Sequence, residues 1–302
     1  IDLRAANKKA FDCLVFAGGF DSFKGVHRAQ YLHDNGDGIT FIEKALKFGS
    51  KFQENKNSAQ VSLFENSLDV QLNEPLIPDC THWTTLDQLK LEKEVVGIYI
   101  SGHPLDDFRL SMQHFCNASL EILKNLNLLI NKELRLGGIV GEVEHRVSKN
   151  GKGWARFILE DYKDSYDFRI FGEEYLKYKH FLFENNFIYM RTIIKEGWRD
   201  RETGKTGDPR INFLSFQQLQ DTLSKNAEKL TLQFDINDFD DLKVDQLKNI
   251  FKKHKGKKKL DISFFENNEK IKLTMPSENY KVSISKELIS LIEKNNIHFK
   301  IN

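Results

Sequence analysis

Residues 134–171 read LRLGGIVGEVEHRVSKNGKGWARFILEDYKDSYDFRIF and open the part of the sequence that decides the fold, which extends to residue 219. Apolar residues alternate along this part as they do in β-strands. The pattern predicts five strands, over residues 136–147, 154–160, 166–171, 187–194 and 211–216. The spacing over residues 173–183 fits a short helix instead. Three strands, a helix and two strands form the order of an OB-fold, so we predict a five-stranded OB-fold β-barrel.

Alternation also predicts which side chains of this barrel face outward. Ala155, Phe157 and Leu159 share one face of their strand and read as core. The opposite face and the adjoining hairpin loop collect two aromatic rings and five cations: Trp154, Arg156, Arg169, Phe171, Arg146, Lys149 and Lys152. Rings can stack on bases while cations hold phosphates, so this set predicts a nucleic-acid-binding face. A solvated hairpin on a purely structural barrel is the alternative interpretation.

Composition narrows the classes of protein that fit. A chain of 302 residues suggests two or three domains. Lys and Arg number 45 and Asp and Glu 44, so any contact with nucleic acid must come from local patches. Cys13, Cys80 and Cys116 are odd in number and lack a CxxC pair, which favours neither disulfides nor zinc and fits a reducing cytoplasm. The sequence shows no membrane span or signal peptide, and Ile1 in place of Met suggests a fragment.

The part before the barrel reads as helical. Helical spacing predicts helices over residues 5–17, 26–32, 40–53 and 85–100. Asn7 is placed to cap the first of them, and Gly18-Gly19 to end it. We therefore predict a helical hairpin region over residues 1–53 and a helical connector over 82–133. Residues 54–81 lack periodicity and read as a linker that carries the apolar pair Leu63-Phe64.

Residues 228–302 read as a separate small α+β domain, so the whole chain is predicted to be α+β and multidomain. Its predicted strands cover residues 230–234, 260–265, 270–275, 280–283 and 297–301, with a turn at Asn267-Asn268 between the second and third. Its predicted helices cover residues 239–251 and 286–293, the second capped by Ser285. Six lysines between Lys252 and Lys259 join the first helix to the second strand. We interpret this run as a solvated turn, with contact to nucleic acid as the alternative.

Two strings of residues make the chain resemble a known family. The first is Ala17-Gly18-Gly19-Phe20-Asp21. The second, EKEVVGIYISGHPLD over residues 92–106, is longer and more specific. Both resemble the C-terminal region of the bacterial replicative DNA polymerase III alpha subunit, and the order of the parts agrees over essentially the whole chain.

The resemblance implies a function for each part. Residues 1–53 would be the end of a helix-hairpin-helix region, and Gln60, Leu63 and Phe64 match the family's sliding-clamp-binding motif. The barrel would contact single-stranded template DNA, and the last domain would bind the tau subunit of the clamp loader. The magnesium ligands of such polymerases belong to a palm domain that this sequence does not contain. The resemblance therefore implies no cofactor and no catalysis for this chain, although the parent protein would be a DNA-directed DNA polymerase.

Two other functions stay open from the sequence. The barrel could belong to an RNA- or tRNA-binding module, since OB-folds bind both kinds of nucleic acid. The chain could also be a structural scaffold that binds only proteins.

Overall fold

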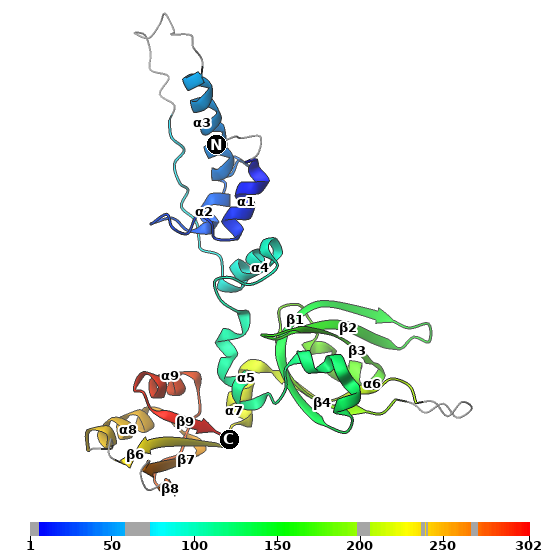
Figure 1. Cartoon of the computed structure of the whole chain (residues 1–302), viewed down its shortest axis with the longest axis vertical. Helices are drawn as coiled ribbons and strands as arrows, with labels where there is room; N and C mark the ends of the chain where they lie inside the picture. The colour runs from blue at the N-terminus through cyan, green and yellow to red at the C-terminus, as the bar shows by residue number, and fades with distance from the viewer. Residues whose placement is uncertain (1–5, 58–72, 198–205, 237–238, 240, 267–270) are drawn as a thin grey trace, which may run out of the picture. The chain divides into compact units, whose positions relative to one another are not determined.

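The structure is a computed structural model that describes residues 6–57, 73–197, 206–236, 239, 241–266 and 271–302. The chain divides into two compact units, Ile1–Pro104 and Leu105–Asn302. Figure 1 shows the helices and strands of both units. Each unit has its own buried apolar residues.

The N-terminal unit is built from four helices. They are α1 (Lys8–Phe16), α2 (Arg28–Leu32), α3 (Phe41–Asn57) and α4 (Thr85–Val96). The predicted cap is confirmed, because the Asn7 side chain accepts a hydrogen bond from the Ala10 N–H at 3.0 Å. Gly18 follows α1 with a φ of +81°, a left-handed conformation that suits the predicted glycine stop. Val15, Tyr31 and Ile42 form the buried centre of this unit.

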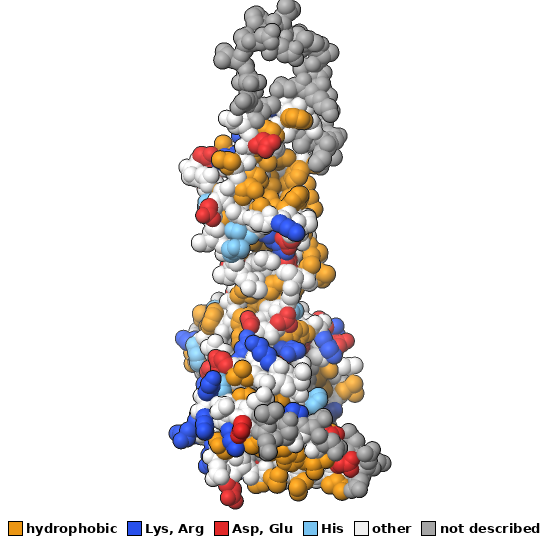
Figure 2. All heavy atoms as spheres, turned by 90° about the vertical axis from the view of Figure 1, so that its left-hand side faces the viewer, with side chains coloured by type: hydrophobic (Ala, Val, Ile, Leu, Met, Phe, Trp, Pro, Cys, Tyr) orange, Lys and Arg blue, Asp and Glu red, His pale blue; other side chains and the backbone are white. Residues whose placement is uncertain are grey.

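Hydrophobic side chains also gather on the surface over these helices, in the upper part of Figure 2. They surround an apolar pocket of about 300 Å³ that includes the rings of Phe11, Phe20 and Tyr31. Residues 73–84 contain no helix or strand and pack along α2. Gln30 donates a hydrogen bond to the Pro78 carbonyl at 2.7 Å, and a His27 ring nitrogen lies 3.1 Å from the Cys80 carbonyl.

The helix predicted over residues 85–100 is shorter than expected. It ends at Val96, because Gly97 adopts a φ of 86° and donates to the Lys93 carbonyl at 2.8 Å. The chain then turns back, so that the N–H groups of Ile100 and Ser101 both donate to the Glu92 carboxylate at 2.9 Å. The predicted end at residue 100 is therefore wrong, because Gly97 ends the helix earlier.

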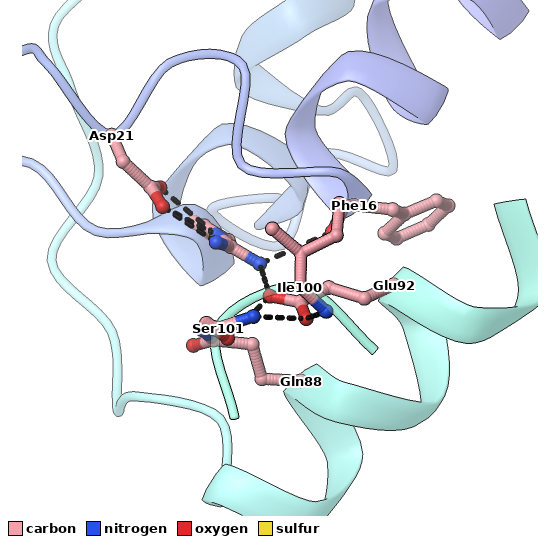
Figure 3. A network of polar contacts seen from close by, with 7 residues as sticks. Phe16, Asp21, Gln88, Glu92, Ile100 and Ser101 are labelled. Atoms are coloured by element: carbon pink, nitrogen blue, oxygen red, sulfur yellow. Dashed lines mark hydrogen bonds and ion pairs between the residues drawn. The ribbon is translucent and has the colours of Figure 1, made fainter. Parts of the chain in front are cut away.

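Arg28 and Glu92 form a buried ion pair that joins the two strings of the family resemblance (Figure 3). Glu92 is fully buried and accepts from Arg28 at 2.6 Å and from the Ser101 hydroxyl at 2.5 Å. The same guanidinium group donates to Asp21 at 2.5 to 3.1 Å and to the Phe16 carbonyl at 3.1 Å. Asp21 comes from the first string, and Glu92 and Ser101 come from the second. Both strings therefore build one polar centre of the N-terminal unit.

This centre sets the pKa of Glu92. Burial of the carboxylate would raise its pKa, but hydrogen bonds from Ser101, Arg28 and Ile100 outweigh burial and lower the pKa from an ordinary 4.5 to about 2. A carboxylate whose pKa is lowered in the folded state stabilises that state above its unfolded pKa.

We expect the N-terminal unit to lose stability as the pH falls from 4.5 toward 2, because Glu92 must then be protonated. The shift corresponds to a loss on the order of 3 kcal/mol of unfolding free energy. Hydrogen exchange of peptides from α2 and α4, corrected for the intrinsic effect of pH, measures it. Glu92→Gln should lower protection at neutral pH and remove most of this pH dependence. Glu94→Gln, on an exposed position of the same helix, is the control and should change neither. An unchanged pH profile in Glu92→Gln would show that another group titrates.

The C-terminal unit begins with the helical segments η1 (Pro104–Phe108), α5 (Arg109–Phe115) and η2 (Leu120–Leu129). An antiparallel five-stranded sheet follows. Its strands are β1 (Glu133–Val147), β2 (Gly153–Glu160), β3 (Ser165–Phe171), β4 (Phe187–Lys195) and β5 (Arg210–Gln218). The predicted helix between β3 and β4 is confirmed as α6 (Gly172–Tyr178) and η3 (Lys179–Phe181).

The predicted closed barrel is not confirmed. The strand order is β3-β2-β1-β4-β5, so β3 and β5 are the two edges, and no ladder joins them among the described residues. The sheet nevertheless curls around one core (Figure 1). Phe168 of β3 and Phe213 of β5 lie 6.0 Å apart between ring centres, and both contact Phe157 of β2. The fold is therefore a curled sheet whose edge strands share side-chain packing.

The first strand carries the irregularities that let the sheet curl. Val140 pairs with Leu159 and Val143 with Phe157, so two residues of β1 face Ile158 alone, which is a β-bulge. Gly138 sits where a Cβ atom would lie 2.4 Å from the Glu160 carbonyl oxygen. Only glycine fits this close approach of β1 to β2.

After α7 (Leu219–Asn226), a second sheet forms the small α+β domain that the sequence predicted. Its strands are β6 (Lys229–Asp235), β7 (Lys255–Glu266), β8 (Ile271–Pro276) and β9 (His298–Ile301), in the order β8-β7-β6-β9. Strands β6 and β7 are parallel and are connected by α8 (Asp241–Lys253). That helix and α9 (Lys286–Lys294), capped by Ser285 as predicted, pack on one face of the sheet over Leu230 and Leu232 (Figure 1).

Two predictions about this domain were wrong. The lysine run is not a turn, because Lys252 and Lys253 end α8 and β7 begins at Lys255. Residues 280–283 form no strand of the sheet, and Val282 makes only isolated bridges with Lys255 and Lys258. These bridges pair the lysine segment with Val282 and hold the segment extended. Pairing thus outweighs the low strand propensity of the lysines. The turn predicted at Asn267-Asn268 lies outside the described residues.

Candidate nucleic-acid interface

The outer face of β1, β2 and β3 brings the predicted strand residues together in two rows. Trp154 lies directly opposite Phe171, and Arg156 lies opposite Arg169. On the other side of β2, Arg146 pairs with Trp154 and Glu144 with Arg156. The predicted inner face is confirmed, since Ala155, Phe157 and Leu159 are fully buried.

The first row is a stacked pair of rings beside a cation. The ring centres of Trp154 and Phe171 lie 5.5 Å apart with an angle of 23° between their planes. The Arg146 guanidinium lies 5.7 Å from the centre of the Trp154 ring, within the range of a cation–π contact. Phe171 is 56% exposed, so a flat apolar ring is presented to solvent next to a cation.

The second row also contains two carboxylates, of which alternation along the strands predicts Asp167 on the outer face. Arg156 donates to Asp167 at 2.7 Å, and this hydrogen bond raises its pKa. Glu144 accepts from Arg146 at 2.5 Å and lies 3.9 Å from Arg156. Alternation could have found Glu144, because it lies two residues before Arg146 on the same face of the strand. The face is therefore less cationic than the seven predicted residues suggest.

Three cations of the predicted set form no ion pair with an acidic side chain among the described residues. Arg169 is exposed on β3, and Lys149 and Lys152 are exposed in the hairpin loop that joins β1 to β2. The loop closes by a hydrogen bond of 2.9 Å from the Gly151 N–H to the Ser148 carbonyl, with Gly151 at a φ of +72°. The loop cations thus stand at the end of the face that carries the stacked rings.

Other predicted residues are not part of this site. Gln60, Leu63 and Phe64 lie outside the described residues. Within the part of the chain that the structure describes, no three His, Cys, Asp or Glu side chains are placed to hold a metal ion. No helix there has the length and apolar character needed to cross a membrane.

The arrangement defines a multidomain α+β chain with an aromatic and cationic sheet face. Comparison with known proteins then gives the family that it resembles: residues 230–302 match the family model described as DNA polymerase III alpha subunit, C-terminal domain. The chain is 30% identical over 185 residues to DNA polymerase III subunit alpha of Mycobacterium tuberculosis (strain CDC 1551 / Oshkosh), which covers 59% of this chain and 15% of that protein. It is 29% identical over 194 residues to the Borreliella burgdorferi protein of the same name, which covers 62% of this chain and 16% of that protein.

The resemblance found in the sequence is therefore confirmed, and the chain spans only about 15% of the length of these relatives. Among solved structures, a small single-stranded DNA-binding protein from Streptomyces coelicolor aligns with 29% of this chain and 94% of its own, at 14% identity and a TM-score of 0.17. An alignment with so low a score does not establish a shared fold.

We expect Trp154→Ala to leave the five-stranded sheet folded, since this ring lies on the outer face and only one ring contact is lost. The free energy of unfolding should fall by about 1 kcal/mol, against roughly 3 to 5 kcal/mol for Phe157→Ala in the core. Urea unfolding followed by far-ultraviolet circular dichroism compares the two variants. An equal loss in both would place Trp154 in the core and shift the strand register by one residue.

Proposed function

We propose that this chain is the C-terminal, non-catalytic part of a replicative DNA polymerase III alpha subunit that works in the cytoplasm. In this proposal it binds single-stranded template DNA, the sliding clamp and the tau subunit of the clamp loader during DNA replication. Nucleotide transfer and its magnesium ions would belong to other parts of such a polymerase. The observation that carries the DNA-binding role is the Trp154–Phe171 stack beside Arg146 and beside Arg169, which has no acidic partner among the described residues.

We further propose that the five-stranded sheet is an OB-fold left open between β3 and β5. Support comes from the order of its elements, with a helix between the third and fourth strands. OB-folds bind oligonucleotides on the face of strands 2 and 3 and with the loops that join strands 1 to 2 and 4 to 5. In this chain those strands carry Trp154 and Phe171, and the first of those loops carries Lys149 and Lys152.

The ion pairs on this face do not oppose binding strongly. The pair between Arg156 and Asp167 is open to solvent, with 36% and 39% of the two side chains exposed. Exposed pairs contribute roughly 0 to 1 kcal/mol, whereas stacking of one base on an aromatic ring contributes about 1 to 3 kcal/mol. Base stacking can therefore outweigh the loss of these contacts, and the guanidinium group of Arg156 can exchange its carboxylate partner for a phosphate.

We expect Trp154→Ala to weaken binding of oligo-dT by about 1 to 3 kcal/mol because a stacking surface is lost. Lys149→Ala should act differently and lower the slope of log K against log salt by about 0.7, the value for one phosphate contact on a single strand. Fluorescence anisotropy at several salt concentrations measures both effects.

Phe183→Ala and Lys225→Ala change an exposed ring and an exposed lysine elsewhere in the same unit, and neither should alter binding. If Trp154→Ala folds normally and binds oligo-dT unchanged, template contact lies elsewhere. Preference for structured RNA over oligo-dT would favour the RNA-binding alternative. Binding to neither, with clamp binding kept, would favour a protein scaffold.

The two protein partners would use separate segments. The clamp would bind Gln60, Leu63 and Phe64, a proposal that rests on the sequence pattern. For tau, support comes from an apolar groove of about 400 Å³ beside the edge strand β8. Ile271, Leu273 and Met275 alternate along β8 and are 45 to 56% exposed in this groove, next to Phe239 and Phe264. An apolar row on an exposed edge strand is a common mark of a protein-binding surface.

We expect Leu63→Ala/Phe64→Ala to abolish clamp binding, since two apolar side chains buried in a partner contribute roughly 3 to 6 kcal/mol. Ile271→Ser/Leu273→Ser should remove tau binding for the same reason. Pull-down of the full chain with purified clamp and tau proteins measures both interactions. Each double variant is the control for the other and should keep the partner that the other loses. A clamp complex that survives the first double variant would contradict the clamp assignment.

A further inference from the structure

The face of the β6–β9 sheet opposite α8 and α9 is basic. The strand registers place four lysines on it, Lys229, Lys259, Lys272 and Lys300, and the alternating exposure of the first residues of β7 adds Lys255 and Lys257. All but Lys229 are exposed. Among the described residues of these four strands, the same face carries two acidic side chains, Asp235 and Asp261. Asp261 is nearly buried and forms an ion pair with Lys229 at 2.8 Å.

Three of these lysines form a regular row. Lys255, Lys257 and Lys259 are exposed while Gly256 and Lys258 between them are half-buried, so exposure alternates along this part of β7. Alternate residues of a strand are about 6.7 Å apart, which is close to twice the rise of about 3.4 Å between successive phosphates of one DNA strand. Lys259 also lies beside Lys229 in the parallel register, so the row continues onto β6. The charges are thus spaced to follow a phosphate backbone.

Repulsion among these lysines lowers the stability of the folded domain when no partner is bound. Like charges on neighbouring strands repel, and Lys229 and Lys259 are direct neighbours. Among the described residues, the ion pair with Asp261 at 2.8 Å relieves this repulsion for Lys229. A polyanion bound on this face would relieve the repulsion among the other lysines.

The composition of the face favours DNA over a protein as that polyanion. Protein interfaces have an apolar centre, whereas the centre of this face contains Thr231, Gln233 and Thr274 around the fully buried Ser263. The composition also favours a duplex over a single strand, which needs aromatic rings for stacking. Of the described residues on these strands, the only Phe, Tyr or Trp ring on this face is Phe265, which is half-buried.

We propose that the lysine face of the C-terminal domain binds the backbone of double-stranded DNA without regard to sequence. This is a second nucleic-acid surface, separate from the aromatic face proposed to bind single strands. It uses lysine charges alone, so its affinity depends steeply on salt.

The test uses the full chain and a fluorescein-labelled DNA duplex of about two helical turns, with anisotropy measured at several salt concentrations. Lys255→Gln/Lys257→Gln/Lys259→Gln should lower the slope of log K against log salt by up to about 2.7, or 0.9 for each lost phosphate contact. Binding near 0.1 M salt should weaken at least about tenfold. The matched control is Lys47→Gln/Lys51→Gln/Lys90→Gln, which removes the same charge from exposed helical positions of the N-terminal unit and should bind like the parent.

A triple Lys→Arg variant at positions 255, 257 and 259 separates loss of charge from misfolding, because it keeps the charges and should keep duplex binding. Equal loss of binding in the Arg variant and the Gln variant would overturn the proposal, as would unchanged duplex binding in a folded Gln variant. Poly-L-glutamate serves as a probe for an acidic protein. If the Gln variant loses poly-L-glutamate but keeps the duplex, the face recognises acidic protein and the proposal fails.

Discussion

The pairing of β1 with both β2 and β4 is the constraint on which the C-terminal unit depends. One register along β1 decides which side chains of three strands enter the core. A slip of one residue between β1 and β2 would turn Phe157 outward and bury Arg156, with the loss of a large apolar side chain and the burial of a charge. The bulge between Val140 and Val143 accommodates the curl without that slip. The stacked rings and the loop cations face solvent together because this register is fixed.

The residues that identify the family most clearly have a structural role in the N-terminal unit. Glu92 and Ser101 belong to the long string, and Asp21 to the short one, and all three surround the buried Arg28 guanidinium. Removal of one partner from a buried ion pair leaves a charge without compensation, at a cost of roughly 3 to 5 kcal/mol. Such a cost explains why these residue types are needed at these positions. The strings therefore stabilise the N-terminal unit of this chain, and the candidate binding surfaces lie on other residues.

Much of the fold could be predicted from the sequence, because alternation and helical spacing report burial directly. The predicted strand of residues 154–160 lies within one residue of β2, and Asn7 and Ser285 cap the helices they were expected to cap. The errors arose where distant contacts override local pattern. Val282 pairs with Lys255 and Lys258 from more than twenty residues away, so a polar run becomes a strand. Asp167 pairs with Arg156 from the neighbouring strand and Glu144 pairs with Arg146 on the same strand, and a count of the charges along one loop includes neither carboxylate.

A net charge of +1 is compatible with two cationic faces because many acidic residues of this chain lie in ion pairs on other parts of the surface. Acidic residues are used in local pairs such as Glu133 with Arg191 and Asp221 with Lys225. Exposed charges are screened beyond about 8 Å at physiological salt, so a partner responds to the nearest few side chains and hardly to the total. The side chains nearest the partner also distinguish the face of β1, β2 and β3 from the lysine face of the C-terminal domain. Rings beside arginines, as at Trp154, suit bases and phosphates together, whereas the evenly spaced lysines of β7 match phosphates alone.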